Sequence, residues 1–176
     1  MANREALREL QARLARRLQA ARTEGVSVSW LAVVACKVNY LFPLAQSGEI
    51  FPMGAVQPVP YVQRWFRGVT NLRGGLFGVV DLASFVTGAP VAARSEQSLA
   101  DACVVTLNAT LEVNCALMVD SLAGLRNPDA FSGFEPAPPD APAYLGNAYT
   151  DSAGHLWQEI NLQAMARLAQ FLNISA

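Results

Sequence analysis

The most informative stretch of the sequence is Gly68-Val-Thr-Asn-Leu-Arg-Gly-Gly-Leu-Phe-Gly-Val-Val-Asp-Leu82. Val69 to Leu72 and Leu76 to Val80 are β-branched or apolar runs of strand length, and Gly74-Gly75 supplies the positive-φ residues that a tight reversal needs. The stretch therefore predicts a β-hairpin with Arg73 at its tip. A guanidinium held there presents a planar fork of donors to the carboxylate or carbonyl groups of a partner.

The residues around this hairpin resemble a known family. The string NLRG is followed by Val79-Val80-Asp81-Leu82 and preceded by Glu49-Ile50 and Pro58-Val59-Pro60, as in the CheW-type coupling proteins of bacterial chemosensory arrays. The similarity runs from about Val28 to Asn173, through Leu117 to Leu122 and Tyr144 to Ala148. The N-terminal extension and the ending Gly154 to Leu162 are more similar to PilI, the version that serves type IV pilus twitching motility. One difference is Gly78, where the family usually has proline.

This resemblance implies a mainly β fold with two small, five-stranded, SH3-like barrels packed on a shared core. It implies a non-enzymatic adapter without a cofactor. One barrel face would bind the regulatory domain of a CheA-like histidine kinase, and the groove near the NLRGG hairpin would bind the cytoplasmic tip of a chemoreceptor. The expected location is the cytoplasm, with recruitment to membrane-associated arrays.

Arg73 also has a plainer interpretation, that of a solvated turn arginine, because arginine is only moderately enriched at interfaces. The upstream Glu49-Ile50 favours a functional interpretation. An exposed pair between Arg73 and Glu49 would be worth only about 0 to 1 kcal/mol, so it would orient the tip rather than hold the fold. Asp81 follows the second strand and is the predicted N-cap of a helical turn over Leu82 to Phe85.

Composition indicates a globular protein. The 176 residues are 52% hydrophobic and 15% charged, which is enough apolar sequence for one sizeable core or two small linked ones. The net charge of -1 argues against broad electrostatic binding to nucleic acid. Charge is uneven, because the first 25 residues hold six arginines and three glutamates.

The three cysteines are Cys36, Cys103 and Cys115, without CxxC spacing, and each lies in an apolar run. They indicate reduced core thiols. The N-terminus is charged where a signal peptide would be apolar, and no apolar run reaches the roughly 18 residues of a spanning helix. We therefore expect a bacterial cytoplasmic protein without direct membrane insertion.

The N-terminal residues 3 to 22 predict a helix that ends at Gly25, with leucines at positions 7, 10, 14 and 18 on one face. We expect residues 1–25 to be an extension of a domain that spans residues 26–176. The leucine face has three possible uses, in order of preference: docking on the barrels, binding a partner, or lying on a membrane surface.

Short strands and turns follow. The expected strands are Val28 to Ala35, Asn39 to Leu44, Ala102 to Leu107, Leu111 to Met118, Val119 to Leu125, Tyr144 to Tyr149 and His155 to Ile160. Prolines interrupt the segment between the second and third of these, so Glu49 to Phe51 and Tyr61 to Gln63 are expected to be short strand or turn pieces. Thr87 to Ser98 reads as a polar loop that divides the β-rich body into two similar halves. The proline-dense segment from Asn127 to Pro142 predicts an extended surface loop. Asn161 is the predicted N-cap of a closing helix.

Few groups offer catalytic chemistry. His155 is the only histidine, and the sequence has no GxSxG, GxxxxGK[ST] or GxGxxG motif. The expected place of His155 is a half-exposed strand position after a turn. The rival to an adapter is a β-barrel enzyme or small-ligand binder that uses Cys36 or His155.

Trp30 and Trp157 lie in apolar strand patterns and are predicted core residues. Trp65 lies between Arg64 and Arg67, a composition typical of interface centres, and both the core and the interface remain open for it. The candidate partner-binding residues are Glu49, Ile50, Trp65, Asn71, Arg73, Gly74, Val79 and Asp81. No residue is assigned to catalysis, a cofactor or a metal.

Overall fold

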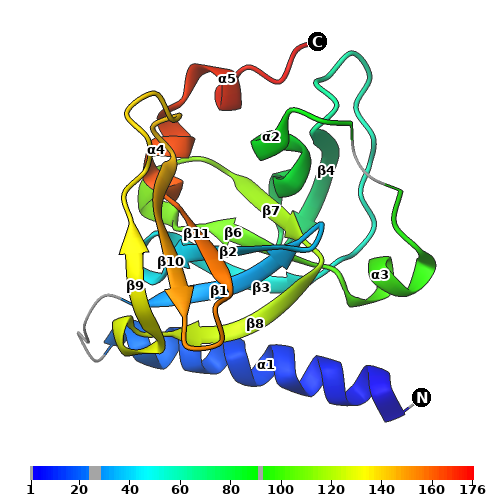
Figure 1. The fold of residues 1–176 in the computed structure, drawn as a ribbon. Helices are drawn as coiled ribbons and strands as arrows, with labels where there is room; N and C mark the ends of the chain where they lie inside the picture. Colours follow the sequence, from blue (N-terminus) through cyan, green and yellow to red (C-terminus); the bar gives the residue numbers. More distant parts are fainter. Residues whose placement is uncertain (1, 24–28, 91–92) are drawn as a thin grey trace.

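A computed structural model describes residues 2–23, 29–90 and 93–176. The chain forms two β-sheets with a long helix beneath them and short helices around them (Figure 1). The mainly β fold predicted from the sequence, with a helix at each end, is confirmed. The predicted end of the first helix at Gly25 and the start of the first strand at Val28 lie outside the described residues.

One sheet has six strands rather than the predicted five. Its strands, in spatial order, are β8 (Ser121–Arg126), β1 (Trp30–Ala35), β2 (Val38–Pro43), β11 (Leu156–Ile160), β10 (Leu145–Asp151) and β9 (Phe131–Glu135). All neighbours are antiparallel except β2 and β11, which are parallel.

The other sheet has five strands. Their spatial order is β3 (Ser47–Pro52), β6 (Cys103–Leu107), β7 (Cys115–Val119), β5 (Gly75–Asp81) and β4 (Phe66–Leu72). Strands β5 and β7 are parallel and the other neighbours are antiparallel. The division of the body into two halves at Thr87 to Ser98 is therefore wrong. The five-stranded sheet comes from the middle of the chain, and the two ends of the β-rich body return to build the six-stranded sheet.

Two segments that were predicted to be loops contain regular structure. Thr87 to Ser98 includes the start of helix α3 (Glu96–Asp101), which Ser95 caps by accepting a hydrogen bond from the Ser98 backbone at 3.1 Å. Asn127 to Pro142 contains β9, which pairs with β10 at the edge of the six-stranded sheet. The prolines of this segment flank β9 and do not interrupt its ladder, because none lies between Phe131 and Glu135.

The helices at the two ends differ. Helix α1 (Ala2–Thr23) contacts β3 of one sheet, β8 of the other and the 3-10 turn η1 (Leu44–Gln46), and it lies along the lower edge of the molecule in Figure 1. Leu14 is buried there and Leu10 is half exposed. At the other end, Asn161 caps α4 (Leu162–Arg167) as predicted, and a break at Leu168 separates it from α5 (Ala169–Leu172).

A single apolar core joins the two sheets. It includes Leu31 and Phe42 from the six-stranded sheet, Val105 and Leu117 from the five-stranded sheet, and Met165 from α4, each fully buried. Trp30 and Trp157 are buried in a smaller cluster on the six-stranded sheet, as predicted. The remaining short helices are α2 (Leu82–Thr87), η2 (Ala109–Leu111) and η3 (Pro128–Ala130).

Candidate functional site

The β4–β5 hairpin forms with Arg73 at its tip, but its backbone differs from the prediction. Leu72 pairs with Gly75, so the two loop residues are Arg73 and Gly74, with φ values of 50° and 81°. Arg73 itself, and not Gly75, therefore takes the left-handed conformation of this type of turn. The side chain of Asn71 accepts a hydrogen bond from the Gly74 backbone at 3.0 Å, which stabilises the reversal.

The guanidinium of Arg73 pairs with Glu49, as the sequence suggested. Its Nη2 lies 3.0 Å from Oε2 of Glu49, and the two side chains are 74% and 50% exposed. The Arg73 Cζ also lies 5.9 Å from the centre of the Phe51 ring. Glu49 is fixed in turn, because its backbone N–H donates to the Thr106 hydroxyl at 2.7 Å. The tip is thus an oriented and accessible cation.

Five of the eight candidate residues offer groups at this surface. Glu49, Asn71, Arg73 and Gly74 are exposed, and Ile50 is partly exposed while it packs against the core. Glu49 and Ile50 lie on β3 at one edge of the five-stranded sheet, and the other three lie on the hairpin that includes the opposite edge. Arg73 and Glu49 meet because the segment that follows β3 runs along β4, where Gln57 and Val69 form an antiparallel bridge.

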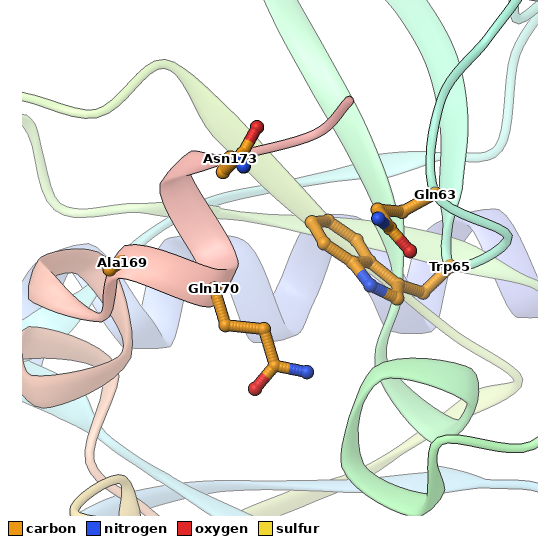
Figure 2. A pocket seen from close by; sticks show the side chains of 5 residues that line it. All are labelled: Gln63, Trp65, Ala169, Gln170 and Asn173. Atoms are coloured by element: carbon orange, nitrogen blue, oxygen red, sulfur yellow. The ribbon is translucent and has the colours of Figure 1, made fainter. Parts of the chain in front are cut away.

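The other three candidates, Trp65, Val79 and Asp81, are buried. Trp65 is only 6% exposed, and its ring stacks on Phe171 at 6.1 Å and meets Phe85 edge-on at 5.0 Å. Figure 2 shows that one edge of the indole borders a pocket beside α5. The structure therefore places the body of Trp65 in the core, and Val79 lies in the sheet interior.

Asp81 has a structural role. Its Oδ1 accepts a hydrogen bond from the Ser84 backbone at 3.0 Å, so it caps α2 as predicted. Its Oδ2 accepts a hydrogen bond from Nη1 of Arg94 at 2.5 Å. Nε of the same guanidinium donates to Asp120 at 2.6 Å, and the Arg94 side chain is only 6% exposed. Sequence reasoning had placed Arg94 in a polar loop and assigned it no role.

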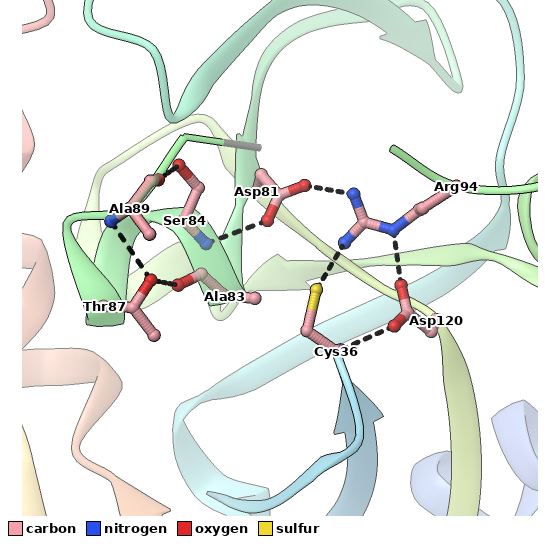
Figure 3. A network of polar contacts seen from close by, with 8 residues as sticks. All are labelled: Cys36, Asp81, Ala83, Ser84, Thr87, Ala89, Arg94 and Asp120. Carbon is pink, nitrogen blue, oxygen red and sulfur yellow. Dashed lines mark hydrogen bonds and ion pairs between the residues drawn. The ribbon is translucent and has the colours of Figure 1, made fainter. Parts of the chain in front are cut away.

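The Arg94 network joins the two sheets (Figure 3). Asp81 ends β5 of the five-stranded sheet, and Asp120 lies between β7 and β8, where the chain passes from one sheet to the other. The second oxygen of Asp120 accepts a hydrogen bond from the backbone N–H of Cys36, in the β1–β2 turn, at 2.6 Å. Burial lowers the pKa of Arg94, but its hydrogen bonds to the two aspartates outweigh this and raise the pKa above its ordinary value.

Cys36 and His155, the residues named for a rival enzymatic function, each contact a charged side chain in the structure. Cys36 is partly exposed, and its Sγ lies 3.8 Å from Nη2 of Arg94; burial raises its pKa. Burial also raises the pKa of Cys103 and of Cys115 to about 12. His155 lies 3.3 Å from Asp151 and is largely exposed. In the described part of the chain, no three histidine, cysteine or acidic side chains gather where they could hold a metal ion.

Comparisons with known proteins agree with the fold. The sequence pattern of the CheW-like domain matches residues 29–170. The scaffolding protein CheW of Thermoanaerobacter tengcongensis has a similar crystal structure, with a TM-score of 0.62 and 17% sequence identity. The match covers 78% of this chain and 90% of that one. A comparison with curated protein sequences finds no match.

The architecture is that of a CheW-like domain, with two SH3-like β-subdomains. The chain belongs to the CheW-like domain family, a family of scaffold domains in chemotaxis signalling. Across residues 2–23, 29–90 and 93–176, no helix is both long and apolar enough to cross a membrane.

Proposed function

We propose that this protein is a non-enzymatic adapter that couples a chemoreceptor to a CheA-like histidine kinase. The observation that carries the proposal is the hairpin tip, where Arg73 is exposed and is oriented by Glu49 and Phe51. A preorganised guanidinium of this kind suits the carboxylates and helix-end carbonyls of a helical receptor tip. Membership of the CheW-like domain family supports the same role.

An adapter transmits signal by geometry. If it contacts receptor and kinase together, receptor state biases kinase activity only when the contacts differ in free energy between the two states. The two sheets share one apolar core and are linked by the buried ion pairs of Arg94 with Asp81 and Asp120. We expect this connection to hold the receptor-binding face and the kinase-binding face in a fixed relative position. No cofactor enters this mechanism, and the partners are proteins rather than nucleic acid.

The pathway we propose is the control of type IV pilus twitching motility. Its support is the similarity to PilI of the N-terminal extension and of the ending Gly154 to Leu162. In the structure the extension includes α1, and the ending comprises the turn before β11, β11 itself, the N-cap Asn161 and the first residue of α4. The proposed location is the cytoplasm, with recruitment to arrays at the membrane through the receptor.

The test is a pull-down of the kinase regulatory domain and of the receptor tip with Arg73→Glu. We expect the variant to keep its circular dichroism spectrum and to lose binding to at least one partner. The matched control is Arg67→Glu, an exposed arginine on β4 of the same hairpin but away from its tip. Unchanged binding of both partners by Arg73→Glu, or an equal loss with Arg67→Glu, would contradict the proposed role of the tip.

A further inference from the structure

The three tryptophans differ in what their indole N–H groups bind. Nε1 of Trp30 donates to Glu159 at 2.5 Å, and Nε1 of Trp157 donates to Asp151 at 3.0 Å. Nε1 of Trp65 has no hydrogen-bond partner among the described residues, although the residue as a whole is only 6% exposed. The residue is buried but its nitrogen atom is not, because no buried side-chain nitrogen or oxygen among the described residues lacks a partner. The N–H is therefore an accessible donor that a ligand can reach.

The free N–H opens on a pocket of about 340 Å³ between the segment before β4 and helix α5. The lining residues are Gln63, Trp65, Ala169, Gln170 and Asn173. In Figure 2 the indole nitrogen lies on the edge of the ring that faces the Gln170 side chain. The floor of the pocket is rigid, because Phe171 and Phe85 hold the ring on its other sides.

Hydrogen bonds within the chain fix two of the three amide side chains. The Gln63 amide nitrogen donates to the Ser175 carbonyl at 2.7 Å, and the Asn173 amide oxygen accepts from the Ser175 backbone N–H at 3.3 Å. This leaves the Gln63 oxygen as an acceptor and the Asn173 nitrogen as a donor. The Gln170 carboxamide has no partner among the described residues and offers both. The pocket thus presents donors and acceptors together.

The lining contains no charged side chain, so a charged ligand would lose hydration without gaining a counter-charge. An uncharged group that both accepts and donates hydrogen bonds fits best. The volume is at the lower end of the range for ligand pockets, which suits one side chain or a short peptide segment rather than a nucleotide-sized cofactor. The amide group meets all of these conditions.

We propose that this pocket binds an uncharged amide group of a partner protein, whose carbonyl oxygen accepts the hydrogen bond of Trp65 Nε1. Its N–H group donates to the free oxygen of Gln63 or Gln170. The amide belongs either to a glutamine or asparagine side chain or to the main chain of the partner. Trp65 then serves both as a core residue and as a binding residue, and the site is separate from the Arg73 tip.

The test uses the protein with ¹⁵N-labelled tryptophan, which gives one indole N–H resonance for each of the three residues, assigned with Trp65→Phe. We expect the Trp65 N–H to exchange with solvent faster than the other two. The protein is then titrated with three peptides at millimolar concentration: acetyl-glycyl-glutaminyl-glycine N-methylamide and its methionyl and glutamyl counterparts, whose N-methylamide ends carry no primary carboxamide. A shift of the Trp65 resonance, with little change at Trp30 and Trp157, is the expected result.

The three peptides separate the two sources of the amide. A larger shift with the glutaminyl peptide than with the methionyl peptide assigns the site to a side-chain carboxamide. Equal shifts with both assign it to the main chain, since both peptides have the same backbone. No shift with either peptide, or the strongest shift with the glutamyl peptide, would overturn the proposal.

A pair of variants checks that the peptide occupies this pocket. Gln170→Leu removes the amide at nearly constant volume and should weaken peptide binding about two- to tenfold, the effect of one lost hydrogen bond between uncharged groups. Gln163→Leu is the matched control, because Gln163 is exposed on the neighbouring helix α4 and does not line the pocket. Equal binding by both variants would place the peptide elsewhere and overturn the proposal. None of these outcomes depends on Arg73, so the adapter proposal stands or falls separately.

Discussion

Arg94 and Arg73 both pair with carboxylates, but one is buried where the two sheets meet and the other is exposed at a hairpin tip. The Arg94 side chain is 6% exposed and binds two aspartates, whereas the Arg73 side chain is 74% exposed and binds one glutamate. Water competes weakly for the first guanidinium and strongly for the second. The same residue type therefore holds the fold in one place and remains available to a partner in the other.

The largest effect is expected from Arg94→Ala. The substitution leaves Asp81, which is 1% exposed, and Asp120 near each other without a counter-charge. Breaking a buried ion pair on one side costs about 3 to 5 kcal/mol of unfolding free energy. Denaturant unfolding measures this loss. A loss below about 1 kcal/mol would show that water already reaches the site and that the junction does not join the sheets.

A second experiment distinguishes charge from packing at the junction. Arg94→Met combined with Asp81→Asn and Asp120→Asn removes all three charges together. Because the cost of the single variant comes from uncompensated carboxylates, the triple variant should be more stable than Arg94→Ala. If it is less stable, shape and hydrogen bonding at this junction matter more than charge.

The next prediction concerns the contribution of helix α1 to the unfolding free energy. We propose that residues 1–25 are an extension that the domain of residues 26–176 does not need for folding. Deleting residues 1 to 24 uncovers β3, β8 and η1 and removes the buried Leu14, so we expect a loss of about 1.5 to 3 kcal/mol and a folded body. Soluble expression and cooperative unfolding of the truncated protein are the readouts. A truncated protein that does not fold would make the leucine face part of the core.

The local features of the sequence predicted local structure well. The hairpin at Arg73 and the N-caps Asp81 and Asn161 depend on residues only a few positions apart, and all three form. The positive φ of Arg73 was missed, because Gly74-Gly75 offered two residues with lower steric cost in the next positions. In the structure the register of the β4–β5 ladder determines which residues form the turn. Because Leu72 pairs with Gly75, the two loop residues are Arg73 and Gly74.

The long-range features were not predictable in this way. Arg94 binds groups that lie 13, 26 and 58 residues away in sequence, and no periodicity marks such a set. The parallel pairing of β2 with β11 brings Tyr40 opposite Gln158, which is why the division of the body into consecutive halves was wrong. Strand β9 was missed for a related reason. Its residues gain their ladder only from β10, across a proline-rich connection.

A fourth carboxylate, Asp151, extends the comparison to a site without an arginine partner. It accepts hydrogen bonds from Trp157 Nε1 at 3.0 Å and from the backbone N–H groups of His155 and Ala153 at 2.9 Å each. These bonds, that of Trp157 foremost, lower its pKa from 3.8 to about 2. The carboxylate is stabilised by fixed N–H donors, so its effect on stability should be smaller than that of Arg94.

The sign of this effect follows from the lowered pKa. Asp151 contributes its stabilisation above the pKa of about 3.8 in the unfolded chain, and loses it as the pH falls toward 2. The difference in unfolding free energy between the protein and Asp151→Asn should therefore be largest above that value and shrink in acid. Urea unfolding at several pH values measures it. A difference that does not change with pH would mean that the ionised form is not the one stabilised.

The smallest effect on stability is expected at the tip itself. Arg73→Ala and Glu49→Ala each remove one half of an ion pair whose side chains are 74% and 50% exposed, so water solvates whichever charge is left. Each variant should lose less than about 1 kcal/mol of unfolding free energy, and the double variant should lose little more than the single ones. The loss of unfolding free energy with Arg94→Ala should therefore be several times the loss with Arg73→Ala or Glu49→Ala. Were Arg73→Ala to cost as much as Arg94→Ala, the tip would be part of the fold's stability, and its proposed role as a surface kept free for a partner would be wrong.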